Sequence, residues 1–278
     1  MKINAYAKIN LTLDITGVRD DGFHTLRSVM APISLCDELI IEKSDALKFD
    51  CNIKSLVTDD NLCIRAAKAF FAESGIENSA SIYLKKNIPF PAGLGGGSAD
   101  AAAVLKGLNE LYGNPLTQDK LFSLAERLGS DVSLCLLGRV ALCEGRGEVL
   151  TELSGLPSLN CVIAIGKGRL STPEVYRKYD AKNLPVRNDT DIFLDALNEG
   201  NIDRIISSFG NAFEPVTDEL CPETKAIREL MMSLGARNSR LSGSGPSVYG
   251  IFADKELAEK AKKSLIEKGY SAYTCEIL

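Results

Sequence analysis

PFPAGLGGGSADAAA, residues 89–103, places four glycines in five positions and then becomes rich in alanine. Glycine in an ordered element costs about 0.5–1 kcal/mol relative to alanine, whereas alanine is the best helix former. The stretch therefore predicts a glycine loop that leads directly into a helix over residues 98–112. Pro89 and Pro91 restrict the backbone ahead of the glycines, which suits a preorganised loop.

The backbone of such a loop is suited to binding an anion. Glycines leave the N–H groups uncovered, and the start of a helix adds roughly half a positive charge. Two familiar phosphate-binding motifs do not fit, because no lysine follows Gly97 as in a Walker A loop, and Ser98 stands where a Rossmann fingerprint has its third glycine. A structural loop where a helix and a sheet approach closely remains the alternative.

Composition and charge limit the class of protein. The 278 residues are 45% hydrophobic and 25% charged, which is typical of a globular protein of one large or two smaller domains. The net charge of −5 argues against nucleic acid as a partner. Eight cysteines without a CxxC pair predict reduced, mostly buried thiols and give no zinc-ligand spacing.

No targeting or membrane segment is indicated. The start, MKINAYAKINLTLDI, has neither an apolar signal-peptide core nor the arginine- and serine-rich pattern of a transit peptide. No window approaches the roughly 20 apolar residues that span a bilayer. We therefore expect a cytoplasmic protein with no membrane partner.

The pattern along the chain predicts an α+β fold. From Ile3 to Ile15 apolar and polar residues alternate, which predicts a strand with one buried face and with Tyr6, Lys8 and Asn10 on the other. Strands and helices follow without strict alternation, which favours α+β over a doubly wound sheet. SGLPSLN, residues 154–160, is a plausible boundary, so we predict domains at residues 1–155 and 156–278.

Three segments together resemble a known family. AYAKINLTLDITGVRDDGFHTLRSVM (residues 5–30), the glycine loop, and LSGSGPSVYGIF (residues 241–252) are similar, in this order, to the three signatures of the GHMP kinases. The resemblance implies an amino-terminal domain like the second domain of ribosomal protein S5 and a ferredoxin-like carboxy-terminal domain. It also implies an active site in the cleft between them.

The resemblance implies a small-molecule kinase that uses ATP with Mg²⁺. The loop has two extra residues between GLG and the serine, and together with Phe23 and His24 this is similar to members that act on a cytidine-diphosphate-bearing methylerythritol. Such members phosphorylate its 2-hydroxyl on the non-mevalonate route to isoprenoid precursors. A homoserine or mevalonate kinase remains an alternative, as does a nucleotide-binding module without turnover.

One carboxylate is a candidate general base. Asp131, in LGSDVSLCLLG, heads an apolar run, so it is either a helix cap or turn residue or a base partly shielded from water. The family resemblance implies that Lys8 and Asp131 form the catalytic pair. The sequence assigns no protein ligand to the metal.

The resemblance also implies the binding residues. For the triphosphate they are Pro89, Ala92, Gly93, Leu94, Gly95, Gly96, Gly97 and Ser98, with Asn61 and Lys86 near the purine. For the acceptor they are Asn10, Phe23, His24, Tyr176, Gly243 and Ser244, with Phe23 and Tyr176 stacking on the base and His24 hydrogen-bonding its edge. Ordinary roles remain open for several of them: a cap for Asn61, a solvated lysine for Lys86, core packing for the aromatic rings, and a tight turn for the second glycine loop.

Three positions depart from the family pattern. Ala99 replaces a serine, which removes one hydroxyl near the phosphates, and Pro91 stiffens the loop. Asp100 lies in the expected first helical turn, where it would repel a phosphate, so we expect its carboxylate to point away.

Overall fold

The computed structural model describes residues 1–77, 79–182 and 184–278. They form two compact units, and the first comprises residues 1–8, 35–89 and 95–138. The second comprises residues 9–34, 90–94 and 139–278. The units are interleaved along the chain, because strands β1 (Lys2–Asn10) and β3 (His24–Lys43) each run from one unit into the other. The predicted domain division at residue 155 stays a prediction.

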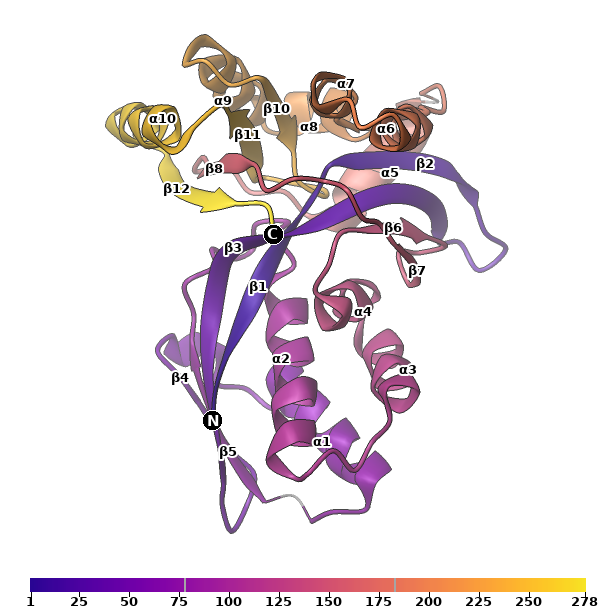
Figure 1. The fold of residues 1–278 in the computed structure, drawn as a ribbon, viewed down its shortest axis with the longest axis vertical. Helices are drawn as coiled ribbons and strands as arrows, with labels where there is room; N and C mark the ends of the chain where they lie inside the picture. Colours follow the sequence, from indigo (N-terminus) through magenta and orange to yellow (C-terminus); the bar gives the residue numbers. More distant parts are fainter. Residues whose placement is uncertain (78, 183) are drawn as a thin grey trace. The chain divides into compact units, whose positions relative to one another are not determined.

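In the first unit, helices cover a sheet. Its elements besides β1 and β3 are β4 (Lys48–Cys51), a 3-10 turn (Lys54–Leu56), α1 (Leu62–Ser74), β5 (Ala80–Lys85), α2 (Gly96–Leu111), α3 (Gln118–Leu128) and α4 (Ser130–Leu137). β1 pairs with β3, β3 pairs antiparallel with β5, and β5 pairs parallel with β4. Figure 1 shows the helices of this unit on one side of these strands.

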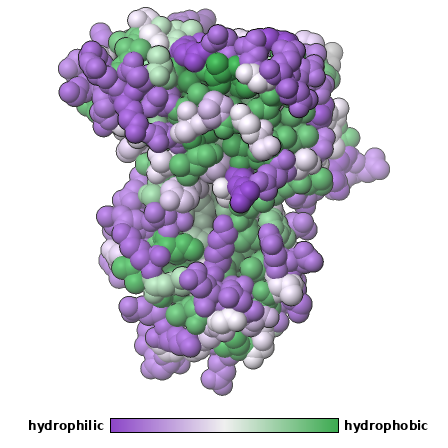
Figure 2. Space-filling model, in the orientation of Figure 1, coloured by the Kyte–Doolittle hydropathy of each residue, from purple (hydrophilic) through white to green (hydrophobic). Residues whose placement is uncertain are grey.

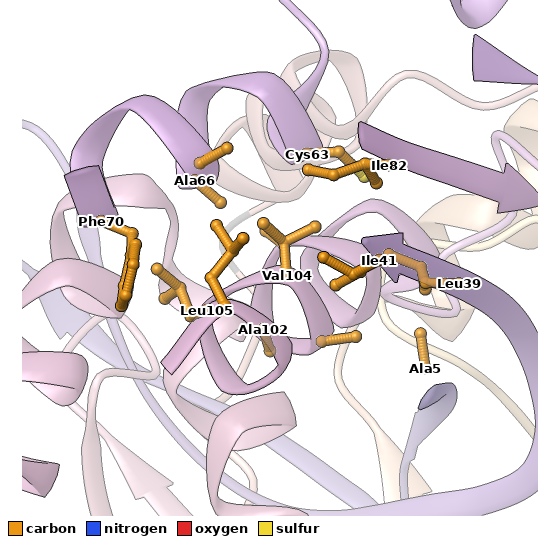
Figure 3. Packing of buried hydrophobic residues seen from close by; sticks show 14 of the residues in the cluster. Ala5, Leu39, Ile41, Cys63, Ala66, Phe70, Ile82, Ala102, Val104 and Leu105 are labelled. Carbon is orange, nitrogen blue, oxygen red and sulfur yellow. The ribbon is translucent and has the colours of Figure 1, made fainter. Parts of the chain in front are cut away.

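Small side chains bury α2 in the core of the first unit. Alanines 99 and 101–103 are at most 4% exposed, and their size lets α1 and α4 pack closely against this helix. In Figure 3, Val104 and Leu105 lie among side chains from α1 and from the sheet, including Ile41 and Ile82. The predicted helix after the glycine loop is confirmed, and it begins at Gly96, two residues earlier than expected.

The predicted first strand divides into two. β1 ends at Asn10, and β2 (Thr12–Val18) follows after Leu11. The apolar face is buried as expected, but Lys8, Asn10 and Asp14 on the polar face are also at most 5% exposed. Each of these polar side chains has a polar or charged partner, such as the Ser28 hydroxyl for Asn10. Both faces of the chain are therefore buried at these positions, although the sequence alternates between apolar and polar residues.

The second unit contains two groups of strands. In the first group β2 pairs antiparallel with β3 and parallel with β9 (Gly210–Asn211), while β6 (Ala141–Glu144) pairs with β3 and with β7 (Val149–Glu152). The other group is a sheet in the order β10-β11-β8-β12, with antiparallel pairing throughout.

The second sheet has the ferredoxin-like βαββαβ order. Its elements are β8 (Asn160–Ile165), α9 (Pro222–Ser233), β10 (Asn238–Leu241), β11 (Val248–Phe252), α10 (Lys255–Glu267) and β12 (Ser271–Glu276). Helices α9 and α10 pack on the sheet. Four further helices lie between β8 and α9 within the described residues: α5 (Thr172–Lys182), α6 (Asp189–Asn198), α7 (Ile202–Ser207) and α8 (Glu214–Leu220). The α+β class and the ferredoxin-like part are confirmed.

The surface and the thiols agree with the composition. Hydrophilic residues cover much of the face shown in Figure 2, with hydrophobic residues between them. Of the helices in the described residues, none has the length and apolar character that crossing a membrane requires. None of the eight cysteines, which all lie in the described residues, forms a disulfide, and all except Cys36 and Cys135 are buried, as expected for reduced thiols.

Candidate active site

Lys8 and Asp131 meet in the first compact unit. Lys8 lies near the end of β1, and Asp131 lies in the first turn of α4. The Lys8 Nζ is 3.2 Å from the Asp131 Oδ2, with the lysine side chain 7% exposed and the aspartate side chain 31% exposed. The carboxylate is therefore partly shielded yet open to a substrate. Such a pair can accept a proton from a hydroxyl group and stabilise the negative charge that develops on its oxygen.

The glycine loop ends at an open helix terminus. Gly95 is the N-cap of α2 in the left-handed conformation, with φ of 66°. The amide of Ala99 donates to the Gly95 carbonyl, so the amides of Gly96, Gly97 and Ser98 precede the first intrahelical bond. These amides and the helix dipole favour an anion at this position.

Gly95 also touches the candidate catalytic lysine. A Cβ at Gly95 would lie 2.8 Å from Cγ and 3.1 Å from Cε of Lys8. Glycine is required at position 95 for two reasons. The left-handed backbone disfavours a side chain, and the Lys8 side chain already occupies the space that a Cβ would need.

Gly95→Ala is therefore expected to lower kcat/KM about tenfold to a hundredfold, because the added methyl group displaces the Lys8 ammonium. Steady-state kinetics on the variant measure this effect. Gly113→Ala is the matched control, since Gly113 has a similar φ of 80° but nothing within 4 Å of its Cβ position. The control shares the backbone strain and should keep normal turnover; equal losses in both variants would contradict the role of the Gly95–Lys8 contact.

Three charged side chains, Lys86, Asp37 and Asp100, form a buried cluster next to Gly96 of the glycine loop. The Lys86 Nζ is 2.5 Å from the Asp37 Oδ2 and 2.7 Å from the Asp100 Oδ2, and all three side chains are at most 4% exposed. The Asp37 Oδ1 also accepts from the amides of Asn87 and Ile88. The Lys86 ammonium lies 2.9 Å from the Cβ position of Gly96. Asp100 thus pairs with Lys86, and because α2 begins at Gly96 it lies beyond the first helical turn where it was expected. Lys86 is not a solvated lysine.

The cluster holds more negative than positive charge. Burial raises the pKa of Asp100 to about 8, with the Asp37 charge adding to the shift and the Lys86 charge opposing it. Burial lowers the pKa of Lys86, but the two carboxylates outweigh it, so the pKa of the lysine is raised overall. A proton on Asp100 would balance the cluster at neutral pH.

This proton predicts a pH dependence of stability. Because the folded pKa of Asp100 lies near 8 and its ordinary value is 3.8, the folded state binds a proton that the unfolded state releases. The stabilisation is complete below the ordinary value and is lost as the pH rises through about 8. We expect the free energy of unfolding to fall from about pH 6 to about pH 9 more steeply in the wild type than in Asp100→Asn. Urea unfolding at both pH values measures this difference; parallel profiles would contradict it.

Asn61 caps a helix. Its side-chain oxygen accepts from the Cys63 amide at the start of α1, and its Nδ2 donates to the Leu56 carbonyl. The ordinary role left open for Asn61 is therefore present, and a contact with a purine stays a prediction. The Lys86 ammonium is paired with Asp37 and Asp100. If Lys86 contacts a purine, it would therefore do so through its other atoms.

The second unit brings the front of the glycine loop against the second glycine loop. A Cβ at Gly93, which has φ of 72°, would lie 2.6 Å from the Ser242 carbonyl oxygen, and the Ser242 hydroxyl donates to the Gly93 carbonyl. The Ser247 amide donates to the carbonyl of Ala92. A Cβ at Gly243 would lie 3.6 Å from the Asn10 Oδ1. These predicted site residues are therefore neighbours.

The same unit collects aromatic rings around His24. The imidazole lies 4.7 Å from the Tyr176 ring, centroid to centroid, and its Nε2 lies 2.7 Å from the Asp180 Oδ1. Tyr176 in turn packs edge-on against Phe213 at 4.7 Å. Phe23 is 57% exposed, with the Arg146 guanidinium 5.4 Å from its ring centroid.

The predicted site residues divide between the units. Those in the first unit are Lys8, Asn61, Lys86, Pro89, Gly95, Gly96, Gly97, Ser98 and Asp131. Those in the second unit are Asn10, Phe23, His24, Ala92, Gly93, Leu94, Tyr176, Gly243 and Ser244.

Several supporting residues escaped the sequence analysis. Asp37 lies within β3, where a charged residue is usually predicted to be exposed, yet its side chain is buried. Asn211 donates to the carbonyls of Leu241 and Gly243 and so fixes the second glycine loop, which Ser244 joins to Thr172 by a hydroxyl contact of 2.7 Å. No local motif marks these residues, because each acts on a segment distant in the sequence.

Two family models and many curated relatives match this chain. The model for the GHMP kinases N terminal domain matches residues 61–139, and the GHMP kinases C terminal model matches residues 186–271. A 4-diphosphocytidyl-2-C-methyl-D-erythritol kinase of Caldicellulosiruptor saccharolyticus is 40% identical over 282 residues, which cover 99% of this chain and 97% of the relative.

Solved structures extend the comparison. A crystal structure of 4-(cytidine 5'-diphospho)-2C-methyl-D-erythritol kinase superposes with a TM-score of 0.87 at 35% identity, covering 100% of this chain and 99% of the other. A homoserine kinase from Cytophaga hutchinsonii, 20% identical, shares the fold with a TM-score of 0.73 over 98% of this chain and 94% of its own. With both family models and a relative 40% identical along nearly its whole length, the chain belongs to the GHMP kinase family.

Proposed function

We propose that this chain is an ATP-dependent kinase that phosphorylates the 2-hydroxyl of 4-diphosphocytidyl-2-C-methyl-D-erythritol, a step toward isoprenoid precursors by the non-mevalonate route. The observation that carries the proposal is the Lys8–Asp131 pair, 3.2 Å apart, with the Lys8 stem against Gly95 at the start of α2. The acceptor is inferred from the name of relatives at about 40% identity and from the residues around His24.

The start of α2 would hold the triphosphate. The amides of Gly96, Gly97 and Ser98 supply donors, and the Ser98 hydroxyl adds another polar group at the same turn. Pro89 and residues 92–94 shape the preceding loop. Asn61, at the N-cap of α1, and Lys86, directly after β5, are proposed to flank the purine. Ala99 supplies no hydroxyl, so these contacts depend chiefly on the backbone.

Magnesium would arrive with the nucleotide. Within residues 1–77, 79–182 and 184–278, no three His, Cys, Asp or Glu side chains gather to hold a metal ion. This fits Mg²⁺, which is commonly bound by substrate phosphates with few protein ligands. When bound, the ion neutralises phosphate charge. Ser98 and Asp131 are the residues proposed to approach it.

The lysine and aspartate would act on the acceptor hydroxyl. Asp131 accepts the proton as the hydroxyl oxygen forms its bond to the γ-phosphorus, while the bond to the β,γ-bridging oxygen breaks and ADP leaves. The Lys8 ammonium stabilises the negative charge that builds on the acceptor oxygen. The carboxylate is 31% exposed, which leaves room for a substrate to reach it.

The second unit would recognise the acceptor. His24 is proposed to hydrogen-bond the edge of the cytosine, with Tyr176 and Phe23 offering their ring faces, since base stacking contributes about 1–3 kcal/mol per base. Asn10, Gly243 and Ser244 are proposed to contact the rest of the acceptor. The small-molecule partner therefore carries a cytidine diphosphate group.

ADP release coupled to an indicator reaction tests the proposal. With ATP and Mg²⁺, we expect release that depends on 4-diphosphocytidyl-2-C-methyl-D-erythritol and is absent with homoserine or mevalonate. Release with either of the other acceptors alone would make the chain a different GHMP kinase. ATP binding with no acceptor-dependent release would make it a nucleotide-binding module.

A further inference from the structure

The imidazole of His24 is held by two neighbours, one of which is itself packed against a third residue. It is the chain's single histidine, its side chain is 10% exposed, and its Nε2 is 2.7 Å from the Asp180 Oδ1 on α5. The Tyr176 ring, one turn earlier on the same helix, lies at 4.7 Å and 41° from it, and Phe213 packs behind Tyr176 at 4.7 Å. Because these contacts fix the ring plane, His24 presents a constant edge.

The carboxylate determines which ring nitrogen carries the proton. A carboxylate can only accept, so the Nε2 that faces Asp180 is the nitrogen that carries the proton whenever the imidazole is neutral. The lone pair is then at Nδ1, which becomes an acceptor. A histidine without this partner would exchange between the two tautomers and offer a donor or an acceptor in turn.

We propose that Asp180 is a positioning residue that locks His24 as the Nε2–H tautomer, so that Nδ1 accepts from the exocyclic amino group of cytosine. This rests on the proposed function and deepens it by naming a specificity determinant. Cytosine carries an amino donor at its C4 edge, whereas uracil carries a carbonyl acceptor there. An Nδ1 acceptor pairs with the first and opposes the second, so the site selects a 4-aminopyrimidine over a 4-oxopyrimidine.

The exposed position of Asp180 makes it suitable for substitution. Its side chain is 52% exposed, and within the described residues its side-chain hydrogen bond is to the His24 imidazole, so Asp180→Ala should fold normally. Asp180→Asn keeps an acceptor oxygen but adds an amide donor, which weakens the tautomer preference without abolishing it. Glu174→Ala is the matched control, because Glu174 is an exposed carboxylate in the first turn of the same helix.

The single histidine allows a direct measurement of the tautomer. Protein labelled with ¹⁵N-histidine gives one imidazole spin system, and long-range ¹H–¹⁵N correlations distinguish the protonated nitrogen from the unprotonated one. At neutral pH we expect the wild type and Glu174→Ala to be Nε2–H, Asp180→Asn to be intermediate, and Asp180→Ala to be a mixture. An Nδ1–H tautomer or a doubly protonated ring in the wild type would overturn the inference.

Kinetics with two acceptors test the consequence. The measurement is the ratio of kcat/KM for the cytidine acceptor to that for its uridine analogue. We expect this ratio to fall roughly tenfold in Asp180→Ala, because one hydrogen bond to a partly buried group is lost. The loss should appear in the KM of the cytidine acceptor, with kcat and the KM of ATP unchanged, and Asp180→Asn should recover part of it.

The outcomes distinguish a failure of this inference from a failure of the proposed function on which it rests. An unchanged ratio in Asp180→Ala, with normal turnover of the cytidine acceptor, overturns the inference alone. A wild type that turns over neither acceptor overturns the proposed function and the base contact with it. Equal loss in Glu174→Ala would assign the effect to the helix rather than to the Asp180–His24 contact, and this too overturns the inference.

Discussion

Asp131→Asn is expected to lower kcat by about 10²–10⁴-fold, the usual contribution of a general base. The amide is nearly the same size as the carboxylate but cannot accept the hydroxyl proton, and it removes the charge that faces the Lys8 ammonium at 3.2 Å. Steady-state ADP release at saturating acceptor measures the loss. Thermal unfolding should stay close to that of the wild type, because the side chain is 31% exposed.

A neighbouring aspartate provides the control for this change. Asp119 occupies the first turn of α3, as Asp131 does in α4, and is exposed. Asp119→Asn removes the same charge from a comparable helix position and should leave kcat unchanged. Near-normal turnover in Asp131→Asn would reject the general-base role and leave Asp131 as a helix-terminal charge.

Lys86→Met is expected to destabilise the fold by about 3–5 kcal/mol, the usual cost of breaking a buried ion pair from one side. Methionine fills the space of the lysine stem, but Asp37 and Asp100 then lie buried without the cation that both contact, at 2.5 and 2.7 Å. Urea unfolding near neutral pH measures the loss, and part of the cost should be relieved at acidic pH as the carboxylates are protonated.

Lys85→Met tests whether burial causes the effect. Lys85 precedes Lys86, and its pair with Glu38 is largely exposed, the lysine side chain being 53% accessible. An exposed pair contributes about 0–1 kcal/mol, so the control should unfold almost as the wild type does. Similar losses in both variants would contradict the buried-cluster explanation for Lys86.

The elements with a strong local signal were predictable from the sequence. The alanine run after the glycine loop became α2, and Thr117 caps α3 as its position before an amphipathic run suggests. Helix α4 was missed because it is only eight residues long and shares Gly129 with the end of α3. The burial of the polar face of β1 was not predicted, because alternation shows which side chains are polar but not which parts of the chain pack against them.

The pairing of Lys8 with Asp131 could be predicted from the family resemblance, whereas their catalytic roles stay a proposal. Lys8 and Asp131 are far apart in the chain, and the structure brings them to 3.2 Å as the resemblance implies. Asp37, Asp180 and Asn211 were not identified, because each acts through a contact between distant segments that no spacing rule describes. The interleaving of the two compact units was not predicted, because β1 and β3 each run from one unit into the other, and a division of the chain at one residue does not describe this.

The four helices α5–α8 form an insertion between the first strand and the first helix of the ferredoxin-like core. The hydrogen-bond ladders of β8 with β11 and β12 involve none of their residues. The pairing register of these ladders therefore places no direct constraint on the Tyr176 and Asp180 side chains. One scaffold can carry different sites on such a segment, and a homoserine kinase shares this fold at 20% identity.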